Sequence, residues 1–367
     1  MPIKLLVGFL FLFANRLLSL DRSVVKADLL SSAKLLDLQF TEPEIDSLYN
    51  DVLDNLANYK AMHGLSLNNS TPLSLWHTAI LPGMQLNKVQ KPIIWDAPTS
   101  VIIPANKNEL AFYSLEQLAY LIKNKKISSL ELTQFFIDRI KKYGDTLQCV
   151  ISIQEDLAYA QAKQADAEIA AGKYRGQLHG IPYGLKDLFA VKNTKTTWGA
   201  APYQNQVIQE DAFVYEKMKA AGAVLVAKFT LGALAMGDYW YGGRTKNPWN
   251  LNFGSSGSSA GSASATVAGL VPFAIGTETL GSIVSPSTAC GATGLRPTFG
   301  SISRSGAMTL SWSLDKAGPI CRSAEDAAVV FHYVKGTDGK DASAVNMPFN
   351  YSVKKDVKKL RIGYAKN

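Results

Sequence analysis

A stretch rich in glycine and serine at residues 254–297 constrains the fold of this chain more than any other feature. Residues 254–262 read GSSGSSAGS, residues 276–283 read GTETLGSI, and a strand-like apolar segment, VPFAI at 271–275, lies between them. Glycines let the backbone turn tightly, so a serine held there can be a nucleophile with oxyanion donors beside it. A flexible linker is the alternative, but linkers do not enclose an apolar strand.

The overall composition is that of a globular enzyme. The 367 residues are 47% hydrophobic and 19% charged, and their number predicts two domains or one large α/β domain with an extension. The net charge is +8, but the lysines are dispersed, which favours solvated helix faces over a nucleic-acid surface. The three cysteines and four histidines are scattered without metal-binding spacing, so we predict no metal site.

The N-terminal segment, residues 1–20, has a lysine followed by an apolar run at 5–14. The run is too short to span a bilayer comfortably. It suits a secretory signal peptide, which predicts a secreted or periplasmic protein; a surface amphipathic helix in a cytoplasmic protein is the alternative. Membrane contact is expected only through this segment, if it is not cleaved.

The rest of the chain divides into a helical and irregular extension at 21–110 and a catalytic domain at 111–367. In the extension, Thr41 and Pro43 mark a helix start. From Ser114 onwards, helical periodicity alternates with short apolar strands, which predicts an α/β sheet covered on both faces. Residues 360–365 (LRIGYA) are predicted as a further strand so near the end that we expect the domain to be incomplete at its C-terminus.

Lys186 is the first candidate for chemistry. It lies in the strand-like segment LHGIPYGLKDLF at 178–189, between apolar neighbours. Burial disfavours the charged ammonium and lowers the pKa of a lysine, so Lys186 could serve as a general base. The structural alternative is an ion pair with the neighbouring Asp187.

Ser282 is the second candidate. It follows Gly281 at the break after the 271–275 segment, where the backbone N–H groups of residues 279–281 could form an anion-binding nest. A helix-capping serine is the alternative.

Three other patterns are weaker. Residues 257–261 (GSSAG) fit G-x-S-x-G, but that motif needs a strand directly before it, and residues 247–253 are loop-like. Ser31 and Lys34 fit S-x-x-K, but the partner motifs are absent. His179 is the only histidine near the motifs, which is weak support for a Ser-His-Asp triad.

Taken together, these segments resemble the amidase signature family. The resemblance rests on GSSAGS at 257–262, GTETLGSI at 276–283, GLRPT at 294–298, LDKAGP at 314–319 and GIPYGLKD at 180–187. It covers roughly residues 114–364 in the order of the family. It implies an α/β/α sandwich with a central mixed, twisted sheet.

The resemblance also implies a mechanism. Ser282 would be the nucleophile, Ser258 a bridging serine preceded by a cis peptide bond, and Lys186 the base that acts through Ser258. The acyl-enzyme would be hydrolysed by water, releasing an acid and ammonia or an amine, with no metal or organic cofactor. The oxyanion hole would be formed by the backbone N–H groups of Thr279, Leu280, Gly281 and Ser282, with Ser259 and Asp187 as supporting residues.

The departures from the family pattern indicate a divergent subgroup. Leu280 and Ala260 replace glycines, and Val284 stands where an arginine is usual. The main prediction is an amidase acting on a small-molecule amide. One alternative is the subunit that supplies ammonia for tRNA-dependent amidation, which would need partner subunits and a cytoplasmic location. The other is an inactive binding homologue. The sequence predicts neither the particular amide nor the oligomeric state.

Overall fold

The computed structural model describes residues 24–67, 70–72, 83–85, 88–353, 357–361 and 363. The chain forms two compact units, residues 1–68 and residues 69–367. The segment at 1–20, on which the signal-peptide prediction rests, lies outside the described residues. In the part that is described, no helix is both long and apolar enough to cross a membrane.

The first unit contains two helices, α2 (Lys26–Leu35) and α3 (Glu42–His63). The helix start predicted at Thr41 is confirmed, because its N–H and hydroxyl donate to the Glu44 carboxylate at 2.7 and 2.8 Å. Pro43 lies in the first turn, where a missing N–H costs nothing. Lys26 forms an ion pair with Asp46 at 2.5 Å and so joins the two helices.

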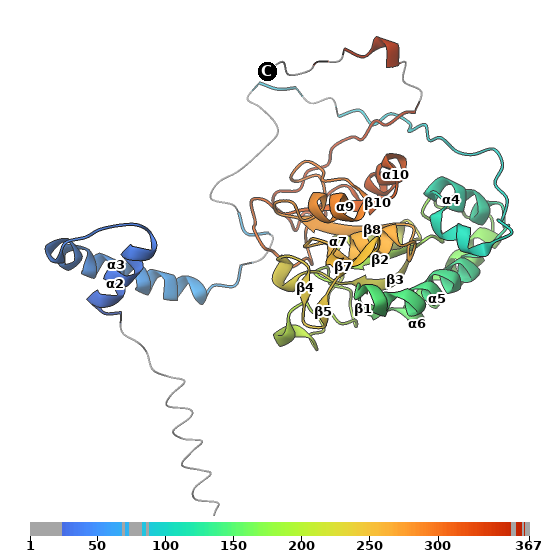
Figure 1. Ribbon diagram of the computed structural model, residues 1–367. Coiled ribbons are helices and arrows are strands. Elements are labelled where there is room, and N and C mark those ends of the chain that lie inside the picture. The colour runs from blue at the N-terminus through green and yellow to red at the C-terminus, as the bar shows by residue number, and fades with distance from the viewer. Residues whose placement is uncertain are drawn as a thin grey trace, which may run out of the picture. The chain divides into compact units, whose positions relative to one another are not determined.

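The second unit is built on a six-stranded mixed sheet in the order β1-β3-β2-β8-β10-β9 (Figure 1). The central strands β3, β2 and β8 run parallel, whereas β1, β10 and β9 pair antiparallel to their neighbours. The mixed sheet predicted from the family resemblance is therefore confirmed. The strands are β1 (Val150–Ile153), β2 (Pro182–Lys186), β3 (Val224–Phe229), β8 (Ala274–Glu278), β9 (Thr293–Gly294) and β10 (Lys316–Cys321).

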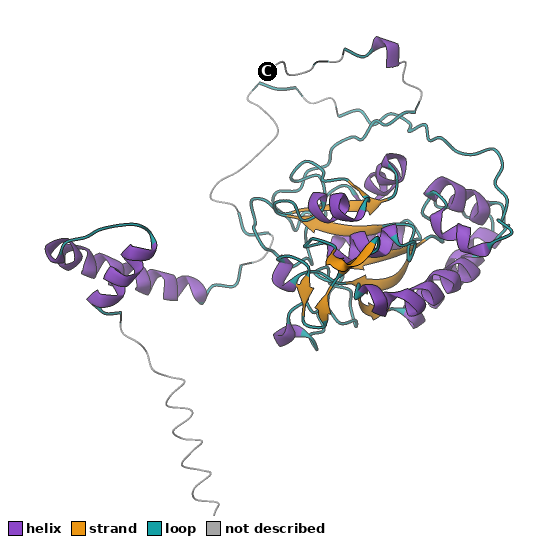
Figure 2. Ribbon diagram, in the orientation of Figure 1, coloured by secondary structure: helices purple, strands orange, loops and turns teal. Residues whose placement is uncertain are grey.

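Helices surround this sheet, as Figure 2 shows. Capping boxes start two of them: Ser128 bonds with Glu131 at α5, and Ser114 bonds with Gln117 at α4. The α-helices of this unit are α4 (Leu115–Lys123), α5 (Ser129–Leu147), α6 (Glu155–Ala170), α7 (Phe213–Ala220), α8 (Ala260–Val267), α9 (Val284–Cys290) and α10 (Ala324–Val334). Short 3₁₀ turns lie at η1 (Lys107–Phe112), η2 (Ala201–Tyr203), η3 (Ala233–Ala235) and η4 (Val357–Lys359).

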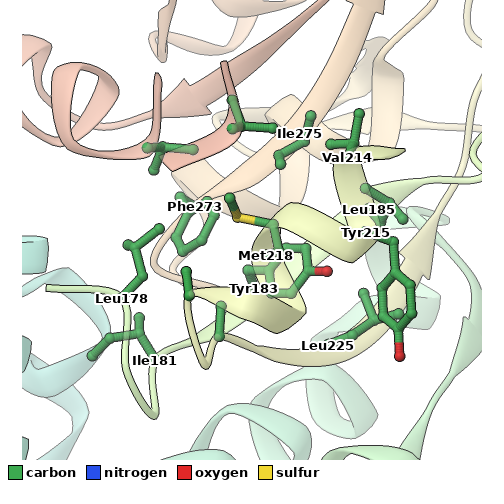
Figure 3. Close-up of a cluster of buried hydrophobic side chains, with 14 of the residues drawn as sticks. Leu178, Ile181, Tyr183, Leu185, Val214, Tyr215, Met218, Leu225, Phe273 and Ile275 are labelled. Atoms are coloured by element: carbon green, nitrogen blue, oxygen red, sulfur yellow. The ribbon is translucent and has the colours of Figure 1, made fainter. Parts of the chain in front are cut away.

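The sheet carries a core on each face, because successive strand residues point to opposite sides. Leu225 and Ile275 pack with α7 and α10 in one cluster, part of which Figure 3 shows. The adjacent Val226 and Ala274 pack with α6 and α8 in the other. This layering places the C-terminal ends of β2 and β8 side by side, which is where the candidate residues lie.

Two expectations about local structure need correction. The central strand β8 runs from Ala274 to Glu278. It therefore includes residues 276–278, which the sequence predicts as a break after the strand. The strand continues because β10 pairs with it as far as Glu278. Residues 247–253 are not a plain loop but part of a two-stranded hairpin, β6 (Lys246–Asn247) with β7 (Asn250–Gly254). A second small hairpin pairs β4 (Tyr239–Trp240) with β5 (Gly243–Arg244).

The strand predicted at 360–365 falls partly outside the described residues. Leu360, Arg361 and Gly363 are described and are not in a strand.

Candidate active site

Lys186 lies at the last position of β2 with its side chain fully buried. Its Nζ donates to the Ser258 Oγ at 2.8 Å and to the Thr277 Oγ1 at 2.9 Å. Burial lowers the pKa of Lys186 to about 7, although the carboxylates of Asp315 and Glu278 oppose this shift. An amine with this pKa, bonded to a serine hydroxyl, can accept a proton near neutral pH.

Ser258 follows a cis peptide bond from Gly257, as the family resemblance implies. Its side chain is buried. Gly257 is required here by close approach, since an added Cβ would lie 1.8 Å from the carbonyl oxygen of Gly237. Ser258 is bonded to Lys186 at the end of β2 and lies two residues before the start of α8.

Ser259 fastens this turn to the sheet. Its Oγ accepts from the Thr277 N–H at 3.1 Å and lies 3.0 Å from the Thr277 carbonyl oxygen, to which it donates. Its own N–H donates to the Ser282 carbonyl at 3.0 Å. Through Ser259, the two serine-rich segments and strand β8 are held together.

Ser282 lies in the loop between β8 and α9 and is 9% exposed. Gly281 precedes it with φ of +87°, a conformation that favours glycine. Among the described residues, no hydrogen bond joins the Ser282 hydroxyl to Ser258 or to another side chain. The structure thus brings together Lys186 and Ser258, and it joins Ser282 to them through the Ser259 backbone.

Glu278 holds the shape of this loop, a role that the sequence reasoning missed. Its Oε2 accepts from the N–H groups of Ile283 and Val284 at 2.8 and 2.9 Å. Burial raises the pKa of this carboxyl, but bonds from the backbone of Val284, Ile283 and Gly281 outweigh it and hold the pKa below its usual range. The signal was available, because Glu278 is an acid directly before the glycine-containing turn.

Leu280, the residue that replaces a glycine of the family, projects from the loop and is 86% exposed. The side chain therefore leaves the backbone of the turn unobstructed. Val284, at the usual arginine position, is also exposed.

Asp187 does not pair with Lys186, so the structural alternative considered for Lys186 is wrong. Asp187 forms a fully buried ion pair with Lys228 of β3 at 2.8 Å. Its second oxygen accepts from the Thr197 N–H and hydroxyl at 2.7 and 2.6 Å. Lys186 bonds to Thr277 of β8, whereas Asp187, the residue after β2, pairs with Lys228 of β3, which leaves Lys186 free for the serine and threonine hydroxyls.

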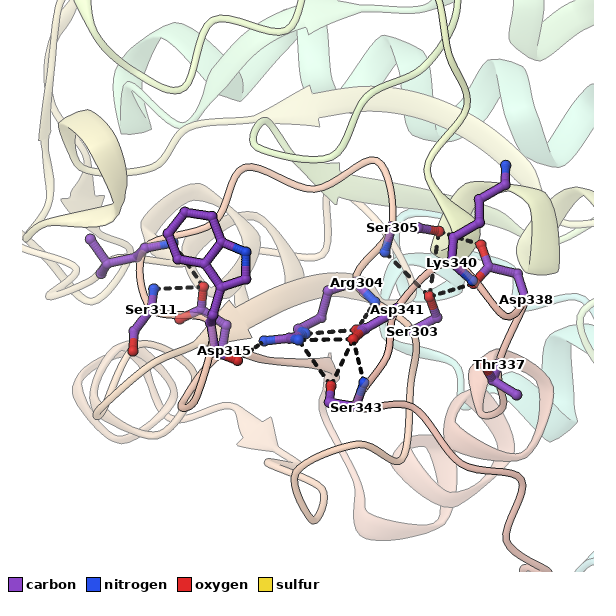
Figure 4. Close-up of polar contacts among 12 residues, drawn as sticks. Ser303, Arg304, Ser305, Ser311, Asp315, Thr337, Asp338, Lys340, Asp341 and Ser343 are labelled. Atoms are coloured by element: carbon purple, nitrogen blue, oxygen red, sulfur yellow. Dashed lines mark hydrogen bonds and ion pairs between the residues drawn. The ribbon is translucent and has the colours of Figure 1, made fainter. Parts of the chain in front are cut away.

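A small hollow adjoins the site. Arg304 lies on its wall, held by a bidentate pair with Asp341 at 2.7 and 2.9 Å (Figure 4). Because both ionic groups are buried and paired, this cluster fixes the wall in place. The hollow is lined by Leu188, Ala235, Thr277, Thr279, Arg304, Ala307, Met308, Thr309, Leu310, Asp315 and Lys316.

Within the described ranges, no group of histidine, cysteine, aspartate and glutamate side chains could hold a metal ion. His179, the weak triad candidate, lies away from the serines: its Nδ1 accepts from the Arg175 N–H at 3.1 Å, and its Nε2 is 3.4 Å from Glu168.

Comparison with known families decides the relationship that the motifs suggested. The family model described as Amidase matches residues 131–367. The chain belongs to the amidase family. The fold agrees, since solved amidase structures superpose on this unit. They include the peptide amidase PAM in complex with the inhibitor chymostatin, at 35% identity and a TM-score of 0.61 over 64% of this chain and 50% of that one. A bacterial aryl acylamidase of the amidase signature family aligns at 26% identity and a TM-score of 0.61, over 65% of this chain and 50% of that one.

Among curated proteins, the amidase chain is similar to the A subunit of glutamyl-tRNA(Gln) amidotransferase. The protein of that name from Coxiella burnetii (strain RSA 493 / Nine Mile phase I) is 45% identical over 64% of this chain and 49% of its own length. That of Legionella pneumophila (strain Corby) is 41% identical over 68% of this chain and 53% of its own length. The chain spans about half the length of the curated relatives it matches.

Proposed function

We propose that this amidase-family chain is a serine amidohydrolase, with residues 111–367 as its catalytic domain. Ser282 is the nucleophile, Ser258 the relay and Lys186 the base. The observation that carries the proposal is the 2.8 Å hydrogen bond between the buried Lys186 Nζ and the Ser258 Oγ. The membership of the chain in the amidase family and the pKa of about 7 for Lys186 support the same assignment.

The proposed reaction has two halves. The Ser282 Oγ attacks the amide carbonyl carbon, its proton passes to Ser258, and the Ser258 proton passes to neutral Lys186. The C–N bond then breaks, and the departing nitrogen takes a proton back through Ser258. Water attacks the acyl-enzyme by the same relay, which releases the acid and restores the Ser282 hydroxyl.

The oxyanion in this scheme lies at the backbone N–H groups of residues 279–282. The Gly281 N–H is among the groups that lower the pKa of Glu278, so an oxyanion would compete with that carboxylate for this donor. The N–H groups of Ile283 and Val284 are already bound to Glu278, which keeps them out of the oxyanion hole. Donors from Thr279, Leu280 and Ser282 therefore carry most of the stabilisation in this proposal.

A second candidate is an ammonia-supplying subunit for tRNA-dependent amidation. Its support is the name of the relatives from Coxiella and Legionella, which are 45% and 41% identical. The chemistry at Ser282 is the same in both candidates, but the amide would be that of glutamine and the ammonia would pass to a partner subunit. This function places the protein in the cytoplasm, whereas a signal peptide at residues 1–20 would place it outside.

Ammonia or amine release from a panel of amides separates the candidates. The panel contains L-glutamine, a C-terminal peptide amide and an aryl acylamide, each incubated with the parent chain and with Ser282→Ala. Release from the peptide or aryl amide that is lost in Ser282→Ala supports the amidase. Release from glutamine alone supports the ammonia-supplying subunit. No release from any amide by a folded chain supports the inactive binding homologue.

A further inference from the structure

Asp315, directly before β10, joins two loops of the site. Its Oδ1 accepts from the Thr279 hydroxyl at 2.5 Å. Its Oδ2 accepts from the N–H groups of Leu310 and Ser311 at 2.8 and 3.0 Å, and Figure 4 shows Asp315 beside Ser311. We call residues 279–283, between β8 and α9, the nucleophile loop, because they include Ser282. One carboxylate therefore ties the segment 309–315, which borders the hollow, to Thr279, the first residue of this loop.

The next residue reinforces this tie. Lys316 Nζ donates to the Thr279 carbonyl at 3.0 Å, so two consecutive side chains bind Thr279 through its hydroxyl and its carbonyl. The register of the sheet explains the placement, because Lys316 pairs with Glu278, the residue before Thr279. Thr279 is thus fixed at the point where the chain leaves β8 for Ser282.

Asp315 also places a negative charge that acts on Lys186. It is the leading charge that opposes the loss of the Lys186 proton, ahead of Glu278. Glu278 is bound to the N–H groups of its own loop, and Asp187 is paired with Lys228 on the other face. The cations Lys316 and Arg304 line the same hollow as Asp315, and Lys316 is bound to Thr279. Glu278 and Asp315 both bind the loop that carries Ser282, but Asp315 is the one that also bonds to Leu310 and Ser311 on the border of the hollow.

We propose that Asp315 is a positioning residue that fixes the nucleophile loop through Thr279 and places its negative charge in the hollow that it shares with Thr277, a hydrogen-bond partner of Lys186. This inference rests on the proposed function of Ser282 and Lys186. The two parts have separable effects. The bond to Thr279 sets the position of the oxyanion donors and hence the maximal rate, whereas the charge sets the pH at which Lys186 loses its proton.

Two substitutions separate these effects. Asp315→Asn removes the charge but keeps an oxygen that can accept from Thr279, so the Lys186 pKa should fall below about 7. Thr279→Val removes the hydroxyl and keeps the charge. It should leave the titration of Lys186 in place and slow serine phosphonylation by a fluorophosphonate at least about tenfold at every pH. Thr279→Ser, which restores a hydroxyl, should recover most of this rate.

The titration is measured by NMR on protein labelled with ¹³C at lysine Cε, with the Lys186 signal assigned by its absence in Lys186→Met. This readout needs no catalysis. Failure of the proposed function would be seen as no fluorophosphonate adduct on any variant, and the titration of Lys186 would still test the inference separately. An unchanged or raised Lys186 pKa in Asp315→Asn would overturn the charge role. A parent-like rate in Thr279→Val would overturn the positioning role, and this arm decides even if Asp315→Asn does not fold.

Discussion

Replacing Lys186 by methionine should make the stability of the fold less dependent on pH. Lys186 is fully buried, and burial lowers its pKa from the ordinary 10.5 to about 7. Between these values the unfolded chain holds the proton and the folded chain does not. Stability therefore rises with pH in this window, since it rises wherever the unfolded state binds more protons.

The size of the effect follows from the same two pKa values. Each pH unit in the window contributes about 1.4 kcal/mol to the free energy of unfolding. At pH 7 the lysine of the folded chain is still half protonated, so the first unit contributes less. Raising the pH from 7 to 9 should therefore stabilise the parent by about 2 kcal/mol through this group. Below pH 7 both states hold the proton and the contribution levels off. Methionine has a similar length and no charge, so Lys186→Met should lose this increment while its stability at pH 7 exceeds that of the parent.

The assay is urea denaturation at pH 7 and pH 9, followed by tryptophan fluorescence. All six tryptophans lie beyond residue 69, so the signal reports the unit that contains Lys186. The measured quantity is the change in the free energy of unfolding with pH in the parent minus that in Lys186→Met, which cancels every other titrating group. A difference near zero would refute the argument that Lys186 loses its proton near neutral pH in the folded state.

Three further predictions follow from single contacts. Asp187→Ala leaves the buried ammonium of Lys228 without its carboxylate and should lower the free energy of unfolding, measured by urea denaturation, by about 3–5 kcal/mol. The double variant Asp187→Asn/Lys228→Met removes both charges and should retain most of the stability. Equal losses in the two variants would contradict the ion-pair account. Ser258→Ala should lower kcat about 10²–10⁴-fold with KM little changed, and a normal burst rate would exclude the relay. Glu278→Gln keeps the size of the side chain but weakens its bonds to the loop N–H groups; it should lower the Tm and slow fluorophosphonate labelling of Ser282, and parent values of both would contradict its role.

The sequence predicted local features well where one short pattern determines them. The capping pattern at Thr41 and the lysine on a buried strand at 182–186 are both present. The strand limits near Glu278 were wrong because β10, about 40 residues later, decides how far β8 pairs. The hairpin at residues 246–254 was missed because its strands are too short to show alternation.

Contacts of the site could not be derived from periodicity. Lys186 and Ser258 are 72 residues apart, and only the family resemblance placed them together. An ion pair with Lys186 was only an alternative for Asp187, and nothing in the sequence indicated that Lys228 of β3, far along the chain, is its partner instead. Asp315 was visible in the motif at 314–319, yet its bond to Thr279, 36 residues away, becomes apparent only in the folded chain.

The most direct test of the central claim is intact-mass analysis after fluorophosphonate treatment of the parent chain and of Ser282→Ala. The account predicts one adduct on the folded parent and none on Ser282→Ala, with labelling that accelerates as the pH rises through about 7, the pKa of Lys186. A folded parent that forms no adduct, or an adduct that persists in Ser282→Ala, would contradict the assignment of Ser282 as an activated nucleophile.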